Sequence, residues 1–140
     1  MANVIETAKA ATIAYNEKNW DKAKAAFVEK PIYDEKATGR RLQGISQILE
    51  AWKGWAQAIP DSKATFVAEY AVGDTAILEV VWRGVHTGPL QMPTRTVPAS
   101  NKRIEIPACQ VVKVEDGKVQ SFTHYFDMLA LLTQIGAFKG

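Results

Sequence analysis

The segment between Gly44 and Pro60 carries the strongest helical pattern in the chain. Its apolar residues recur every three or four positions, which places them on one broad face of a helix. That face comprises Ile45, Ile48, Leu49, Trp52, Trp55, Ala56 and Ile59. Because two tryptophans add a large apolar area, the fold must supply a broad surface that packs against this helix.

Two shorter helices are expected before it. Asn3, with Glu6 three residues later, is a variant of the capping box and opens the first, whose inner face ends at Tyr15. Asn19 caps a second helix, which Pro31 ends because proline cannot continue helical hydrogen bonding. The inner side of this second helix is predicted to carry Trp20, Ala23 and Phe27.

After Pro60 the pattern changes to that of β-strands, with β-branched residues and tight turns at Gly73-Asp74 and Asp116-Gly117. The predicted strands cover residues 65–70, 75–85, 102–114 and 118–127, and a terminal helix that stops at Gly136 follows. Helices followed by consecutive antiparallel strands predict an α+β fold, with N-terminal helices packed on a curved antiparallel sheet. We expect one domain over residues 1–140.

Residues 88–101 contain three of the six prolines, Pro89, Pro93 and Pro98, and are predicted to form a long loop. Such a loop is uncommon in a compact domain unless it has a task such as covering a site.

Composition excludes several functional classes. The net charge is only +2, and the basic runs at residues 39–41 and 101–103 are too short to follow a nucleic-acid backbone. A bilayer span needs about 20 apolar residues, and the sequence has no such run, so no membrane partner is expected. A single cysteine, Cys109, favours a reducing compartment, and Met1 to Glu6 lack the pattern of a signal peptide. We therefore expect a cytoplasmic protein.

Gln110 is the first polar candidate. Ile104, Ile106 and Ala108 alternate along the strand 102–114, and the same parity puts Gln110 on their apolar face unless Pro107 introduces a bulge. A buried amide must be hydrogen-bonded. It would either bridge backbone groups or orient a ligand in a pocket.

Two histidines and one carboxylate are further candidates. His86 lies between Gly84 and Gly88 where a strand gives way to the long loop, and it is either a structural side chain or a proton-exchanging group. Asp127 ends the last strand and would either cap the terminal helix or face a pocket as a general base. His124 differs from Asp127 in strand parity, so the two need not share a face.

No metal site or cofactor is predicted. Two histidines far apart and one cysteine do not make a recognisable ligand set. The sequence also has no Gly-rich phosphate loop and no dinucleotide-binding fingerprint.

Several blocks resemble one known family in order and spacing. Residues 82–88, Trp-Arg-Gly-Val-His-Thr-Gly, are similar to the "(W/R)-x-G-T-H-x-G" segment of SnoaL-like polyketide cyclases, also called ester cyclases. Residues 59–61, 73–74, 115–119 and 126–136 resemble further blocks of that family. The family belongs to the nuclear transport factor two-like, or cystatin-like cone, superfamily, and the resemblance covers residues 5–136.

The resemblance implies a cone with an internal pocket, packed as a homodimer through the outer face of the sheet. It also implies cofactor-free acid/base chemistry, an aldol ring closure in which Asp127 matches the general acid/base. His86 and Gln110 match positions where the family places polar groups in its pocket.

These observations predict an enzyme that removes a proton next to a carbonyl of a hydrophobic small molecule. Asp127 would be the base, and His86 and Gln110 would hold the developing oxygen anion. The predicted pocket walls are Tyr15, Trp20, Tyr33, Trp52, Trp55 and Trp82, with His124 as a further substrate-binding residue. The alternatives are a non-catalytic binding module, a ketosteroid-isomerase-like or dehydratase-like enzyme on the same fold, or an interaction protein that uses its outer sheet face.

Overall fold

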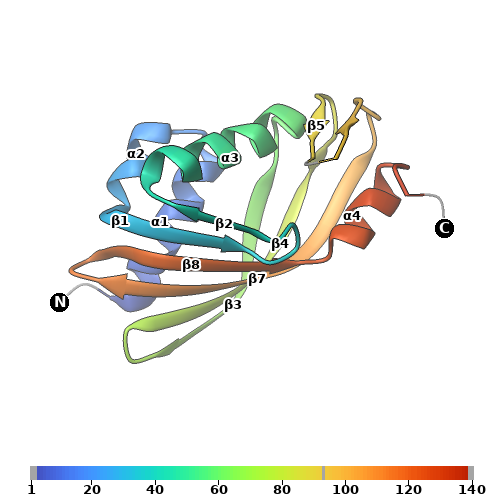
Figure 1. The fold of residues 1–140 in the computed structure, drawn as a ribbon. Coiled ribbons are helices and arrows are strands. Elements are labelled where there is room, and N and C mark those ends of the chain that lie inside the picture. The colour runs from blue at the N-terminus through green and yellow to red at the C-terminus, as the bar shows by residue number, and fades with distance from the viewer. Residues whose placement is uncertain (1–2, 93, 139–140) are drawn as a thin grey trace.

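The computed structural model describes residues 3–92 and 94–138 (Figure 1). The elements are α1 (Val4–Asn16), α2 (Trp20–Ala25), β1 (Phe27–Glu35), β2 (Arg40–Gln43), α3 (Ile45–Ala58), β3 (Lys63–Val72), β4 (Thr75–Val85), β5 (Leu90–Gln91), β6 (Thr96–Val97), β7 (Arg103–Glu115), β8 (Lys118–Phe126) and α4 (Met128–Gln134). The predicted α+β class is confirmed.

Six strands form one sheet in the order β2-β1-β8-β7-β4-β3, and the short strands β5 and β6 pair separately. All pairs in the large sheet are antiparallel except β1 with β8, which is parallel. Figure 1 shows α2 and α3 above the strands β1 and β2, α1 behind these strands, and α4 at the far end of the sheet. The helices and the concave face of the sheet therefore enclose the interior.

The start of each N-terminal helix follows from its capping residue. Asn3 Oδ1 accepts hydrogen bonds from the backbone N–H groups of Ile5 and Glu6, and Asn19 Oδ1 accepts one from that of Lys22. These bonds satisfy donors that the first turn of a helix leaves free.

Residues 27–43 differ from the prediction. The second helix ends at Ala25, and Phe27 and Pro31 both belong to β1. Pro31 lies where the register of β1 against β8 shifts, between Phe27 and Ile32, and a strand tolerates proline at such an irregularity. Beyond the shift, burial alternates along the strand, so Tyr33 and Glu35 both face the interior.

Pro107 does not introduce a bulge. The register of β4 against β7 is continuous from Thr75–Lys113 to Val85–Arg103. Gln110 therefore keeps the parity of Ile104 and Ile106 and is fully buried.

The predicted loop of residues 88–101 contains the β5–β6 hairpin, while Pro93 lies outside the described residues. Leu90 and Val97 from this hairpin are buried in an apolar cluster with Ile59, Ile104 and Leu131. The hairpin thus closes the end of the interior at which α4 also packs.

Candidate functional site

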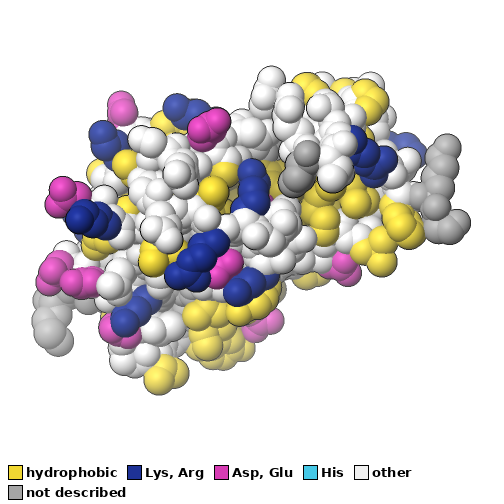
Figure 2. All heavy atoms as spheres, viewed as in Figure 1, with side chains coloured by type: hydrophobic (Ala, Val, Ile, Leu, Met, Phe, Trp, Pro, Cys, Tyr) yellow, Lys and Arg dark blue, Asp and Glu magenta, His cyan; other side chains and the backbone are white. Residues whose placement is uncertain are grey.

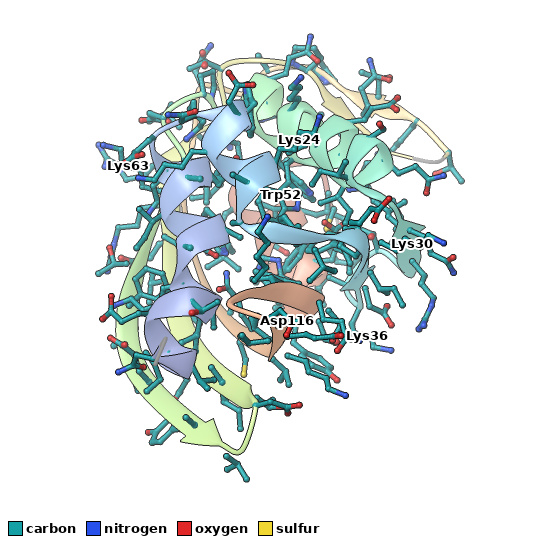
Figure 3. All side chains as sticks on the ribbon, turned by 90° about the vertical axis from the view of Figure 1, so that its left-hand side faces the viewer. Lys24, Lys30, Lys36, Trp52, Lys63 and Asp116 are labelled. Carbon is teal, nitrogen blue, oxygen red and sulfur yellow. The ribbon has the colours of Figure 1, made fainter. Side chains whose placement is uncertain are left out.

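An internal cavity of about 80 Å³ lies between the helices and the sheet. Its wall is mostly aromatic and aliphatic, with a few polar side chains. It is lined by Thr12, Tyr15, Tyr33, Glu35, Trp52, Trp55, Ile59, Ser62, Trp82, Ile104, Ile106, Gln110, Phe122, His124, Phe126 and Leu131. Figure 3 shows Trp52 of α3 in the interior, between the helices and the sheet.

A row of polar residues crosses four neighbouring strands at the cavity. The strand register pairs Arg40 of β2 with Glu35 of β1, Glu35 with His124 of β8, and His124 with Gln110 of β7. Residues at paired positions of neighbouring strands point to the same face of the sheet, so these four side chains are neighbours across the strands. The sheet itself therefore assembles this group.

Glu35 is the carboxylate of the row and lies between Arg40 and His124. Its side chain is fully buried, and Oε1 accepts hydrogen bonds from Thr38 Oγ1 at 2.6 Å and from Arg40 Nε and Nη2 at 3.1 and 2.8 Å. Its Oε2 accepts from Tyr33 Oη at 2.9 Å and from Trp55 Nε1 at 3.0 Å. Burial acts to raise the pKa of Glu35, but the Thr38 hydrogen bond and Arg40 outweigh it and hold that pKa below its usual value. Glu35 is therefore ionised.

His124 lies between two aromatic side chains with polar ends. Its Nδ1 is 3.0 Å from Tyr33 Oη, and its Nε2 accepts a hydrogen bond from Trp82 Nε1 at 3.2 Å. Burial lowers the pKa of His124 to about 4, with the negative charge of Glu35 acting in the opposite direction. The imidazole is therefore neutral near pH 7 and able to accept a proton.

Gln110 contributes a donor that has no acceptor. Its Oε1 accepts a hydrogen bond from Thr12 Oγ1 at 3.0 Å, while its buried Nε2 has no hydrogen-bond partner among the described residues. A buried N–H without a partner is costly. A ligand oxygen in the cavity would satisfy it.

Apart from the polar row, the hydroxyl groups of Tyr15 and Ser62 also lie at the cavity wall and pair with each other. Tyr15 Oη and Ser62 Oγ are 2.6 Å apart, and burial raises the pKa of Tyr15 to about 12, although the Ser62 hydrogen bond lowers it. Tyr15 is therefore a neutral hydroxyl that is already paired.

Most of the predicted pocket residues line the cavity: Tyr15, Tyr33, Trp52, Trp55, Trp82, Gln110 and His124. Trp20 does not. It packs edge-on against Tyr15 on the helical side, with Lys53 Nζ 5.9 Å from its ring centre.

His86 is also absent from the cavity wall, although it is fully buried. Its Nδ1 accepts a hydrogen bond from the backbone N–H of Ser100 at 3.2 Å and lies 2.9 Å from Ser100 Oγ. Burial lowers its pKa, and a backbone hydrogen bond with Gly88 acts against this. His86 therefore joins β4 to the segment before β7, and the predicted role in holding a substrate oxygen is not retained.

The glycines beside His86 have a packing reason. A Cβ on Gly84 would collide with Ile59, and one on Gly88 would collide with the backbone carbonyl of Gln57. Residues 84–88 thus pack against the C-terminal end of α3 so closely that a side chain at Gly84 or Gly88 would not fit.

The structure places Asp127 outside the cavity. Its side chain is exposed, and Oδ1 accepts a hydrogen bond from the backbone N–H of Ala130 at 3.0 Å as the N-cap of α4. The position needs only a side-chain oxygen that can accept this bond. The prediction of Asp127 as a general base is therefore corrected, and the carboxylate at the cavity is Glu35.

Sequence reasoning missed Glu35, Arg40, Thr38 and Ser62. Glu35 was overlooked because the second helix was predicted to run as far as Pro31, and the residues after it were assigned to no strand. The period-two alternation of Pro31, Tyr33 and Glu35 is the signal that could have identified a strand with an inward carboxylate.

The described residues contain no group of three histidine, cysteine, aspartate or glutamate side chains placed to hold a metal ion. Within residues 3–92 and 94–138, no helix combines the length and apolar character that crossing a membrane requires.

The sequence matches the family model of the SnoaL-like polyketide cyclases over residues 5–135. The chain belongs to this family. A search of curated proteins gives no significant match. The expected family and fold are thus confirmed.

Solved structures of low sequence identity share the fold of this family member. TsrD from Streptomyces laurentii is 23% identical with a TM-score of 0.79, over 95% of this chain and 94% of that one. IdmH from Streptomyces antibioticus, provisionally described as a polyketide cyclase, is 19% identical with a TM-score of 0.81, over 96% and 99%. A protein from Catenulispora acidiphila with a ketosteroid isomerase-like fold, solved with trimethylamine, is 21% identical with a TM-score of 0.76, over 97% and 95%.

Proposed function

We propose that this protein is a cofactor-free enzyme that removes a proton next to the carbonyl group of a small hydrophobic substrate, with His124 as the general base. The observation that carries the proposal is the pairing of His124 with Gln110 on one face of the sheet. This arrangement sets a neutral base beside an unpaired N–H donor inside an apolar cavity.

The chemical step uses these two groups. The substrate carbonyl oxygen accepts a hydrogen bond from Gln110 Nε2. His124 Nε2 takes the proton from the adjacent carbon, releasing its hydrogen bond from Trp82, and the C–H electrons form the enolate. The enolate then attacks a second carbonyl of the same molecule, an intramolecular aldol closure, and His124 returns the proton to the new alkoxide.

The wall of the cavity favours an uncharged substrate. Glu35 is the ionised side chain among the cavity-lining residues, and Arg40 already neutralises it. Burying a further charge beside these rings would be costly. Members of the family take small hydrophobic ligands, which agrees with this preference.

Proton exchange at a simple ketone tests the proposal without knowledge of the natural substrate. Cyclopentanone in D₂O exchanges its α-protons, and ¹H NMR measures the rate with and without protein. We expect catalysed exchange, and we expect His124→Gln to reduce it by about a hundredfold, the usual range for loss of a general base. Asp127→Asn is the matched control and should retain full activity. Exchange that survives in His124→Gln but is lost in Asp127→Asn would overturn the assignment.

A non-catalytic binding module is the second candidate, favoured by one observation. Both nitrogens of His124 and both oxygens of Glu35 already have partners. A pure binding site needs only the Gln110 donor. Saturable cyclopentanone binding, lost in Gln110→Leu and accompanied by no exchange, would identify this second function.

We further infer that the protein acts in the cytoplasm as a homodimer. The single cysteine and the family resemblance support these two inferences.

A further inference from the structure

The two histidines of this chain have opposite hydrogen-bond surroundings. His124 receives a hydrogen bond at Nε2 from Trp82, whereas His86 receives one at Nδ1 from the backbone N–H of Ser100. A nitrogen that accepts a hydrogen bond carries no proton, so a neutral imidazole must hold its proton on the other nitrogen. The surroundings thus select Nδ1–H in His124 and Nε2–H in His86.

The hydrogen bonds around His124 can run in one direction only. Indole Nε1 of Trp82 is a donor and never an acceptor, and the ionised carboxylate of Glu35 is an acceptor and never a donor. Tyr33 Oη donates its proton to Glu35 Oε2 at 2.9 Å, so it accepts from His124 Nδ1 at 3.0 Å. The chain therefore runs from Trp82 through His124 and Tyr33 to Glu35.

Glu35 is itself held on every side. Arg40 and Thr38 occupy its Oε1, and Trp55 shares its Oε2 with Tyr33. The carboxylate therefore cannot rotate away without breaking several charge-assisted hydrogen bonds. Its position at the paired register of His124 fixes the far end of the chain.

We propose that Tyr33 and Glu35 are positioning residues that hold His124 as the neutral Nδ1–H tautomer, which leaves Nε2, now hydrogen-bonded by Trp82, as the nitrogen that can take up a proton. The use of that nitrogen in catalysis rests on the proposed function above. When Nε2 accepts a proton, Nδ1–H keeps its bond to Tyr33, and the negative charge of Glu35 stabilises the imidazolium. No hydrogen bond on that side has to rearrange.

Nitrogen-15 NMR of the two imidazole rings tests the proposal directly at neutral pH in the intact protein. We expect the Nδ1–H pattern for one ring and the Nε2–H pattern for the other, with His86→Asn leaving only the Nδ1–H pattern. Two Nε2–H patterns, or an Nδ1–H pattern that disappears in His86→Asn, would overturn the proposal whatever the activity.

Tyr33→Phe keeps the aromatic ring and removes the hydroxyl that accepts from His124 Nδ1 and donates to Glu35 Oε2. We expect the Nδ1–H share of His124 to decrease, because Nδ1–H loses its acceptor while only the Trp82 bond at Nε2 still favours that tautomer, and the cyclopentanone exchange rate to fall by at least about tenfold. Tyr70→Phe is the matched control because it makes the same change at an exposed tyrosine of β3 that does not line the cavity. An unchanged His124 spectrum in Tyr33→Phe, or the same change in Tyr70→Phe, would contradict the positioning role.

The two readouts separate this inference from the proposed function. An Nδ1–H tautomer that depends on Tyr33 in a protein without exchange activity would support the positioning and refute the enzyme. Exchange activity in a protein whose His124 is the Nε2–H tautomer would support the enzyme and refute the positioning role.

Discussion

At the scale of single residues, the surroundings of a carboxylate decide what it can do. Asp127 is exposed and its side chain accepts from the first turn of α4, so it acts on the helix. Glu35 is fully buried and accepts hydrogen bonds from four side chains, so it remains charged inside the protein. The two acids therefore have different roles although both lie close to strand ends.

Replacement of Asp127 by alanine should lower the free energy of unfolding by about 1 kcal/mol, because α4 loses its cap. Asp127→Ser should restore most of that stability, since a serine hydroxyl can accept the same hydrogen bond. Urea denaturation of the three proteins measures the difference. Equal stability of the alanine variant and the wild type would show that the cap contributes nothing.

The lowered pKa of His124 makes stability depend on pH. The unfolded chain takes up a proton at His124 near its ordinary pKa of 6.5, whereas the folded protein does so only near about 4. Stability should therefore fall as the pH drops from 6.5 toward 4, at up to about 1.4 kcal/mol per pH unit for this one group. His86, whose pKa is also lowered, adds a loss of the same sign.

Urea denaturation at about pH 7 and pH 5 measures this loss. In His124→Gln the slope with pH should be smaller, with only the His86 share remaining. A wild-type protein equally stable at both pH values would mean that His124 is not buried in its neutral form.

At the scale of elements, the hairpin of β1 and β2 links the surface to the cavity. Arg40 on β2 is partly exposed, while its partner Glu35 on β1 is fully enclosed. Removal of one partner from a buried pair leaves an uncompensated charge.

Arg40→Met should therefore destabilise the protein by roughly 2–3 kcal/mol, less than for a fully enclosed pair because water reaches Arg40. Arg41→Met is the matched control, since Arg41 pairs with Asp34 at the surface and should change stability by less than about 1 kcal/mol. Thermal unfolding of both variants and the wild type measures the two losses of stability. Similar losses in the two would contradict the importance of the Glu35 pair.

The same hairpin marks where sequence-based prediction failed. The helices at residues 4–16 and 45–58, and the four long strands from residue 63 onward, have periodicity and turn residues that act locally, and they were predicted. The short strands β5 and β6 were not, because residues 88–101 were predicted to form a loop. The strand 27–35 contains Pro31 and pairs in parallel with β8, almost a hundred residues away. No local pattern encodes such a pairing.

The candidate site was only partly predictable for the same reason. The aromatic wall and Gln110 follow from the parity of single elements. The row from Arg40 through Glu35 and His124 to Gln110 exists only once four strands are in register. Asp127 was favoured by family resemblance, although its capping role was a recognised alternative.

At the scale of the whole molecule, one face of the sheet encloses the cavity and the other carries exposed apolar residues. Tyr70 and Val72 of β3 and Tyr125 of β8 are about half exposed or more. Figure 2 shows apolar side chains gathered below the sheet and beside α4. Surface patches of this kind mark interaction sites.

A homodimer through the outer sheet face remains the prediction for this surface. Sedimentation velocity should then give twice the chain mass of 15.4 kDa, and Tyr125→Glu should shift the protein to monomer. His124 lies on the opposite face, so exchange activity should survive that substitution. A monomeric wild-type protein would remove the dimer from the account.

The pH dependence of cyclopentanone exchange tests the central claim most directly, because the claim is that a neutral, enclosed His124 accepts the proton. The account predicts a rate that stays constant from about pH 8 down to about pH 5.5 and declines as His124 becomes protonated near its lowered pKa of about 4. A rate that instead titrates near the ordinary histidine pKa of 6.5, or a profile identical in His124→Gln, would contradict it.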